Sequence, residues 1–243
     1  MMKADLHIHT VLSPCGDLDM SPVNIIDEAK RKGLSIIGIS DHNSTRQAPV
    51  VKEYGEKAGI TVLMGVEINT QEEVHCLAFF PTLERLNEFQ CYLDLHLPNI
   101  PNNPEKFGYQ VVVNIEESII YEEERILVSA IDEDIESVEK TVHWLDGIFI
   151  PAHINKSFAS ILSQLGFVPP GLNCDALEVS SHISPECFLQ ENTYLKKYAF
   201  IQSSDAHYVV DIGKAYTELK LNDTFFESIR KAIANHFVNV EPS

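Results

Sequence analysis

Short apolar runs alternate with helix-forming stretches along most of this chain, which is the pattern of β/α units around a parallel sheet. The predicted strands cover residues 6–8, 35–40, 61–65, 75–80, 147–152, 176–180 and 199–203. Helices are predicted at about residues 22–32, 49–58, 83–95, 135–145 and 224–235. About seven strands with helical crossovers predict an α/β fold, a distorted (β/α)7 barrel of the TIM-like kind.

The alternation breaks between about residues 97 and 132. The stretch LPNIPNNPEKFG at 97–108 is rich in Pro and Asn, and the residues after it predict one strand with a charged extension. We interpret this segment as an insertion on the barrel, because 243 residues suit one barrel-sized domain. Residues 1–243 are therefore predicted to form a single domain.

Possible metal ligands follow the predicted strands. They are His7 and His9, Asp41 with His42, Glu67, His153, and Asp205 with His207. The carboxyl ends of the strands of a parallel barrel meet at one face, so we expect these side chains to form one cluster. Within it, His7 and His9 stand two residues apart on a strand, and both imidazoles can reach one ion.

Five short motifs carry these residues: DLHIHT at 5–10, SDHN at 40–43, GVEI at 65–68, PAHI at 151–154 and SDAH at 204–207. In their order, spacing and strand context they closely resemble the motifs of the polymerase and histidinol phosphatase (PHP) superfamily. The resemblance implies a distorted (β/α)7 barrel that binds up to three divalent ions and hydrolyses phosphoesters.

The resemblance also implies three ligand sets. The first ion would be bound by His7, His9, Glu67 and Asp205, and the second by Glu67, His75 and His153. His75 starts an apolar run, so a buried core histidine is the other interpretation of that residue. The third ion would be bound by His42, His207 and a side chain from the loop after the first strand. We expect two to three divalent ions, of zinc, manganese or iron.

The loop ligand of the third site has two candidates in SPCGDLDMSP. Counting back from the helix that begins at Ser21 and Pro22 favours Asp17, whereas counting forward from His9 favours Cys15. We predict Asp17, because a carboxylate suits the oxygen-binding ions of phosphoryl chemistry, whereas a thiolate would favour softer ions such as zinc. A turn-forming role for Asp17 is the alternative.

Other polar residues are expected around the cluster. Asp5 and Asp41 are predicted to orient ligand imidazoles through hydrogen bonds. Arg46 and Lys156 come from loops at strand ends and are candidates for binding the substrate phosphate. His182, just after a predicted strand, is a third candidate for substrate contact.

The predicted reaction is attack on phosphorus by a hydroxide that the divalent ions create from bound water. The net charge of −18 should repel polyanions, so we expect a small phosphomonoester, a nucleotide or a short oligonucleotide as substrate, and no long nucleic acid. A barrel amidohydrolase is an alternative, although it would typically use a bridging lysine. A metal-binding module without catalysis is another.

The remaining expectations concern location and partners. No stretch approaches the roughly 18 apolar residues of a membrane span, so no membrane association is predicted. The segment MMKADLHIHT lacks the apolar region of a secretory signal, and the five cysteines are dispersed, which suits reduced thiols. A cytoplasmic location is expected, and the oligomeric state is not predicted.

Overall fold

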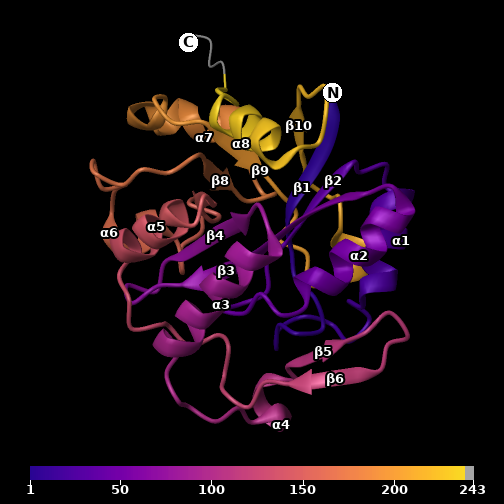
Figure 1. Ribbon diagram of the computed structural model, residues 1–243. Coiled ribbons are helices and arrows are strands. Elements are labelled where there is room, and N and C mark those ends of the chain that lie inside the picture. The colour runs from indigo at the N-terminus through magenta and orange to yellow at the C-terminus, as the bar shows by residue number, and fades with distance from the viewer. Residues whose placement is uncertain (239–243) are drawn as a thin grey trace.

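A curled sheet forms most of a barrel in the computed structural model, which describes residues 1–238 (Figure 1). Six strands are hydrogen-bonded in the order β10 (Thr217–Leu219), β1 (Met2–Ile8), β2 (Ile36–Ile39), β3 (Thr61–Asn69), β4 (His75–Phe80) and β7 (Ile148–Pro151). A parallel pair, β8 (Leu177–Val179) and β9 (Phe200–Gln202), continues the curve.

Backbone contacts join this pair to both sides of the sheet. Ile154 N–H donates to Glu178 O at 2.8 Å beyond the end of β7, and Ile8 of β1 forms a parallel bridge with Ala206 after β9. The strands β1, β2, β3, β4, β7, β8 and β9 therefore follow one another around a distorted barrel. The predicted fold class is confirmed, and these strands are the seven that the apolar runs predicted. The short β10 was not predicted.

Helices connect the strands and cover the outside of the sheet (Figure 1). They are α1 (Pro22–Arg31), α2 (Ala48–Ala58), α3 (Leu83–His96), α4 (Pro104–Phe107), α5 (Ile135–Trp144), α6 (Ile161–Leu165), α7 (Pro185–Glu191) and α8 (Phe226–Ala234). The start of α5 shows how the local sequence sets a helix boundary. The Asp134 carboxylate accepts a hydrogen bond from Ser137 N at 2.7 Å and caps the helix. Among the described residues, no helix has the length and apolar character that crossing a membrane requires.

Strand β4 runs opposite to the direction expected of a β/α unit. It pairs antiparallel with both β3 and β7, and His75 at its start lies beside Asn69 at the end of β3. The five residues between β3 and β4 are too few for the crossover that a parallel connection needs, so they form a hairpin instead. This reversal brings the first residue of β4 to the rim where the neighbouring strands end.

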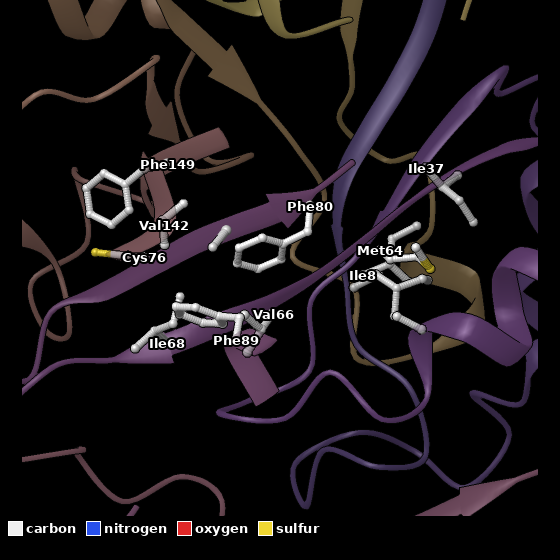
Figure 2. Packing of buried hydrophobic residues seen from close by; sticks show 14 of the residues in the cluster. Ile8, Ile37, Met64, Val66, Ile68, Cys76, Phe80, Phe89, Val142 and Phe149 are labelled. Carbon is white, nitrogen blue, oxygen red and sulfur yellow. The ribbon is translucent and has the colours of Figure 1, made fainter. Parts of the chain in front are cut away.

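The two faces of β4 pack against different groups of apolar side chains. Cys76 and Phe80 belong to the large cluster between the sheet and the helices, where the rings of Phe80 and Phe89 of α3 lie 4.7 Å apart (Figure 2). Phe79 belongs to the second cluster on the other face. The alternation follows from the two-residue period of a strand.

Gly65 of β3 leaves space that the ring of Phe79 needs. A Cβ atom at Gly65 would lie 2.2 Å from Ala78 O and 2.4 Å from Phe79 Cδ1. Gly38 of β2 contacts the same ring, since its Cβ would lie 2.8 Å from Phe79 Cε1. The glycine of GVEI therefore lets β3 and β4 pair closely two residues before Glu67.

The segment 97–132 contains α4 and a two-stranded hairpin of β5 (Val111–Val113) and β6 (Ile119–Glu122). One strand with a charged extension was predicted here, and that prediction is wrong. The chain reverses at Asn114, whose side-chain oxygen accepts hydrogen bonds from Glu116 N and Ser118 N at 3.1 and 2.9 Å. The exposed face of β6 carries no apolar alternation from which a second strand could be predicted.

Candidate metal centre

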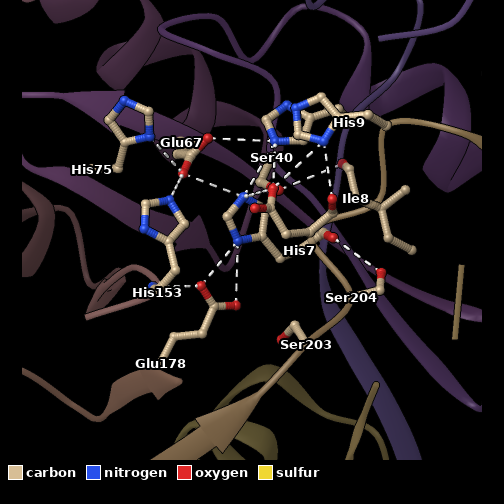
Figure 3. A network of polar contacts seen from close by, with 12 residues as sticks. His7, Ile8, His9, Ser40, Glu67, His75, His153, Glu178, Ser203 and Ser204 are labelled. Carbon is tan, nitrogen blue, oxygen red and sulfur yellow. Dashed lines mark hydrogen bonds and ion pairs between the residues drawn. The ribbon is translucent and has the colours of Figure 1, made fainter. Parts of the chain in front are cut away.

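Imidazoles and carboxylates from distant parts of the chain meet at the rim of the barrel. Figure 3 shows His7, His75 and His153 grouped around Glu67, with Glu178 next to His7. Neighbouring imidazole rings in the cluster have centroids 4.2–5.8 Å apart, and they belong to His7, His9, His42, His75, His153 and His207. Every histidine predicted as a ligand therefore lies in this one cluster.

The nitrogen and oxygen atoms of the first predicted ligand set lie at nearly equal distances from one another. His7 Nε2 and His9 Nε2 are 3.2 Å apart. Asp205 Oδ1 lies 3.3 Å from the first nitrogen and 3.4 Å from the second. The oxygens of Glu67 lie 3.3 and 3.4 Å from the same two nitrogens.

These separations fit a bound ion. Four ligands placed about 2.0–2.1 Å from a tetrahedral ion are roughly 3.3–3.4 Å apart from one another. The donors also suit a divalent ion, because two imidazole nitrogens and two carboxylates combine neutral and anionic ligands. His7, His9, Glu67 and Asp205 could therefore hold the first ion.

Glu67 lies between the first set and a second group of imidazoles. Its Oε1 lies 3.0 Å from His75 Nδ1 and 3.1 Å from His153 Nε2, and its Oε2 lies 3.2 Å from His42 Nδ1. Burial alone would raise the pKa of Glu67, but His75, His7 and His42 outweigh it and hold this pKa well below its usual range. The carboxylate is thus ionised and placed to bridge two ions.

The third group contains Cys15 and not Asp17. The ligand atoms of His9, Cys15, His42 and His207 all lie within 4.8 Å of one another. Asp17 contributes backbone only, since its N–H donates to His207 O at 2.9 Å while its carboxylate accepts from Asp19 N at 2.9 Å in a turn. The prediction of Asp17 as the loop ligand disagrees with this geometry, because the side chain serves the turn instead.

Burial keeps several of these imidazoles neutral, as metal ligands must be. It lowers the pKa of His42 well below the usual value, and it lowers the pKa of His153 as well. The pKa of His207 falls to about 4 for the same reason, with a further contribution from the nearby His9. Within residues 1–238 the buried Nδ1 of His153 has no hydrogen-bond partner, and that of His42 makes no hydrogen bond of acceptable geometry although Glu67 Oε2 lies 3.2 Å away.

Glu178 of β8 is a buried carboxylate that the sequence did not identify. Its Oε2 lies 3.0 Å from His7 Nδ1 and accepts a hydrogen bond from His153 N at 2.9 Å. Because a carboxylate accepts, Nδ1 of His7 carries a proton, so Nε2 is the nitrogen that could bind an ion. The only sequence signal was one acidic residue within the apolar run ALEVS.

Asp41 orients His9 through Ser13. The Ser13 hydroxyl donates to Asp41 Oδ1 at 2.7 Å, so its oxygen accepts from His9 Nδ1 at 3.0 Å. The lone pair of His9 Nε2 is therefore free to face the first group. Asp5 has a different role from the predicted one. Its carboxylate accepts from Ser204 N at 3.0 Å and from Gly213 N at 2.8 Å, on either side of Asp205 in the chain, and it makes no hydrogen bond to an imidazole ring within residues 1–238.

Two of the candidate ligands have a backbone conformation that residues other than glycine rarely adopt. His153 has φ of 30° and Asp205 has φ of 53°. Such conformations cost roughly 1–3 kcal/mol each, and they persist where the surrounding structure requires them. Here they turn both side chains back over the rim just after their strands end.

Two pockets open at the cluster and share Lys156 and Asp205. The pocket over the imidazoles has a volume of about 270 Å³ and is also lined by Cys15 and Phe158. The adjoining pocket has about 540 Å³ and is lined by Ser180, Ser181, His182, Ser204, Asp211 and Lys214, besides Lys156 and Asp205. Lys156 Nζ also contacts Asp205 Oδ2. Lys156 and His182, the two loop residues predicted to contact substrate, therefore both line the pocket beside the cluster.

Arg46 lies outside these pockets. Its guanidinium pairs with Asp94 at 2.7 Å and lies over the ring of Tyr121 at 5.1 Å. The prediction that Arg46 faces a substrate phosphate therefore disagrees with the structure. Asp94 on α3 draws the side chain away from the rim, and no local sequence pattern indicated that distant partner.

Two family models match the chain. A model described as PHP domain matches residues 5–162, and a model described as PHP-associated matches residues 195–235. The first match covers all the ligand candidates up to His153, and the second covers Asp205 and His207.

Known proteins resemble the chain over nearly its whole length. The uncharacterized protein YqxK of Bacillus subtilis is 26% identical, across 96% of this chain and 64% of its own length. The solved structure of PfuEndoQ, a lesion-specific endonuclease from Pyrococcus furiosus, superposes with a TM-score of 0.70 at 22% identity, covering 96% of this chain and 56% of that one. The chain thus spans less than two thirds of both.

A related structure corrects the expectation about partners. Endonuclease Q in complex with a 27-mer duplex that has an abasic lesion at the active site superposes with a TM-score of 0.70 at 21% identity, covering 96% of this chain and 56% of that one. The prediction that long nucleic acid is excluded is therefore wrong. It depended on the net charge of the whole chain, which constrains the local field of one pocket only weakly.

Proposed function

The chain belongs to the PHP domain family, and from this membership we propose that it hydrolyses phosphoesters with a cluster of two to three divalent ions. The observation that supports this most strongly is the position of Glu67. Its carboxylate is 1% exposed and lies within 3.4 Å of imidazole nitrogens from His7, His9, His42, His75 and His153. A buried anion surrounded in this way is suited to bridge cations.

When bound, divalent ions would activate water and neutralise charge on the phosphate oxygens. The protein residues have separate roles around them. His7, His9 and Asp205 would hold one position, while His75 and His153 would hold the next across Glu67. Glu178 keeps the ring of His7 in the ligating tautomer, and Lys156 supplies a cation at the pocket edge.

The adjoining pocket favours a polar phosphorylated substrate. Lys156 and Lys214 provide cations, while Ser180, Ser181 and Ser204 provide hydroxyl groups and His182 an imidazole. A volume of about 540 Å³ is that of a site for a small ligand. We therefore propose a phosphomonoester, a nucleotide or the end of a short oligonucleotide as substrate.

Cleavage of damaged duplex DNA is the second candidate. It is favoured by the likeness to the lesion-specific endonuclease, which extends over 96% of this chain. The likeness covers 56% of that structure. The two candidates share the chemistry and differ only in what surrounds the phosphate.

A substrate panel tests the proposal. Chelator-treated protein reloaded with Mn²⁺, Fe²⁺ or Zn²⁺ is offered nucleotides, short oligonucleotides and duplexes with an abasic site, and release of phosphate or strand cleavage is followed. Amide substrates are tested in parallel for ammonia, which would point to the amidohydrolase alternative. We expect phosphoester cleavage that falls more than about 100-fold in Glu67→Gln.

A matched control separates this effect from general damage. Glu53 is an exposed glutamate on α2 that pairs with Lys57 at 2.7 Å, and Glu53→Gln should retain full activity. Metal-loaded protein that cleaves no phosphoester in the panel, or a Glu67→Gln variant as active as wild type, would contradict the proposed function.

A further inference from the structure

We propose that Cys15 is a thiolate ligand at the third ion position, which it forms with His42 and His207, and that this position selects a thiophilic ion such as Zn²⁺ over Mn²⁺ or Mg²⁺. The proposal rests on the metal centre described above. It concerns which ion binds at the third position and which protein atom of the loop binds it.

The backbone of the loop after β1 fixes where Cys15 lies. Ser13 N–H donates to Thr10 O at 3.1 Å, and Gly16 N–H donates to Ser13 O at 2.9 Å, so the chain makes two consecutive tight turns around Cys15. Gly16 is required there, since a Cβ atom would lie 2.5 Å from Thr10 O. The next residue, Asp17, then donates its N–H to His207 O, which ties the loop directly to the other ligand segment.

The side chains of this group face one pocket. Cys15, His42 and His207 all line the space of about 270 Å³ that also exposes Glu67. Cys15 is exposed as a residue, but it lines that pocket, where desolvation and the charge of Glu67 raise the pKa of its thiol to about 12. A bound cation would reverse this effect, because it favours the thiolate.

Two imidazoles in the group have nitrogens available for an ion. His42 is only 6% exposed, and its Nδ1 makes no hydrogen bond of acceptable geometry in the part of the chain that the structure describes, although Glu67 Oε2 lies 3.2 Å away. His207 Nδ1 lies 2.9 Å from Asp205 O, and a carbonyl only accepts, so Nδ1 carries the proton. His207 Nε2 therefore carries no proton, and its lone pair is available to an ion. A buried imidazole nitrogen that makes no hydrogen bond is costly unless a ligand satisfies it.

The donor set distinguishes this position from the other two. The groups around Glu67 and Asp205 include carboxylate oxygens, whereas the group of Cys15, His9, His42 and His207 consists of sulfur and nitrogen donors. Sulfur and imidazole ligands favour Zn²⁺, while oxygen ligands suit Mn²⁺ and Mg²⁺. The third position would therefore prefer a different ion from the other two.

Absorption of the cobalt-loaded protein tests the ligand directly. Co²⁺ replaces Zn²⁺ in such sites, and a thiolate bound to Co²⁺ gives a sulfur-to-metal charge-transfer band in the near ultraviolet. We expect this band when chelator-treated protein is titrated with Co²⁺, and we expect added Zn²⁺ to remove it. Excess Mg²⁺ should not.

Three variants locate the band. Cys15→Ser should abolish it and lower the Zn²⁺ affinity of one position more than about tenfold. Cys15→His should also lack the band but should recover the bound ion, which shows that the loss in Cys15→Ser is a loss of ligand and not of folding. Cys91→Ser, at an exposed cysteine of α3, and Asp17→Asn should both keep the band.

The cobalt experiment can fail or succeed independently of the substrate panel. A band that survives Cys15→Ser, or that never forms in the wild-type protein, overturns the assignment of Cys15 even if phosphoesters are cleaved. A Cys15-dependent band in a protein that cleaves no phosphoester supports the assignment and contradicts only the proposed reaction.

Discussion

The Glu178 carboxylate accepts a hydrogen bond from His7 Nδ1 at 3.0 Å, with both side chains fully removed from solvent. This contact lies on the far side of the imidazole from the nitrogen that faces His9 and Asp205. A second hydrogen bond, from His153 N at 2.9 Å, holds the same carboxylate in place. Glu178 therefore couples two segments that carry candidate ligands and lie 146 residues apart in sequence.

Replacing Glu178 by Gln should weaken metal binding about 10–100-fold, because the amide can donate as well as accept and no longer fixes the tautomer of His7. The affinity is measured by competition between the protein and a chelator. Glu218 of β10 offers a matched control, as an exposed glutamate on a strand of the same sheet, and Glu218→Gln should bind metal normally. Equal affinities for the two variants would show that Glu178 does not tune the site.

The ligands could be predicted from sequence because each belongs to a short segment at the end of a strand. His7, His42, Glu67 and His153 all follow apolar runs, and barrel geometry brings such positions together. His75 was less clear, because its strand is reversed. The short link between Asn69 and His75 indicated the reversal, because a crossover to a parallel strand needs more residues than this link contains.

Other features depend on contacts that no local pattern records. Glu178 becomes a partner of His7 only because β8 pairs with β9, and the chain after β9 pairs with β1. Arg46 points away from the rim only because it pairs with Asp94 of α3. The choice between Cys15 and Asp17 depended on how two tight turns direct the side chains of these two residues. Counting residues from either end of the loop could not decide that.

Lys156 and Arg46 should respond differently to the loss of charge. Lys156 lies in both pockets at the cluster, so Lys156→Met should raise the KM of a phosphoester substrate at least about tenfold, in line with about 1.5–3 kcal/mol for a hydrogen bond to a charged group. Arg46 pairs with Asp94 instead, so Arg46→Met should leave KM within about twofold.

Steady-state kinetics of both variants, at saturating metal, checks this difference. Metal content is measured alongside, because Lys156 also contacts Asp205. If Arg46→Met raised KM as much as Lys156→Met, the guanidinium would have to reach the substrate by leaving Asp94, and its observed position would not be the functional one.

Gly65 should not tolerate a methyl group. Gly65→Ala would place Cβ 2.2 Å from Ala78 O, so β3 and β4 would have to separate at the point from which Glu67 projects. We expect a loss of about 1–3 kcal/mol in the free energy of unfolding, together with weaker metal binding. Gly171→Ala is the control, since no atom lies within 4 Å of its Cβ position, and it should change stability by less than about 0.5 kcal/mol. Urea unfolding of both variants measures the difference.

His143 should make stability depend on pH at a place remote from the metal centre. Its ring lies between Glu139 and Asp175, with Nε2 3.1 Å from Asp175 Oδ2, and Asp175 also accepts from Phe149 N at 2.9 Å. Burial alone would lower the pKa of His143, but hydrogen bonds to Asp175 and Glu139 outweigh it and raise this pKa. The ring therefore joins α5 to the start of β7 through charged hydrogen bonds.

A raised pKa in the folded state means that protonated His143 stabilises the protein fully below the unfolded value of about 6.5 and loses that effect as the pH rises through the folded value. His143→Gln should accordingly be less stable than wild type by about 1.5–3 kcal/mol at about pH 5.5, and the difference should shrink by about pH 9. Urea unfolding in chelator at both pH values measures it. His96→Gln removes a histidine whose partner Asp132 is 70% exposed, and should cost less than about 1 kcal/mol. A deficit of His143→Gln that grew with pH would have the wrong sign and would show that the neutral ring is the form that stabilises the fold.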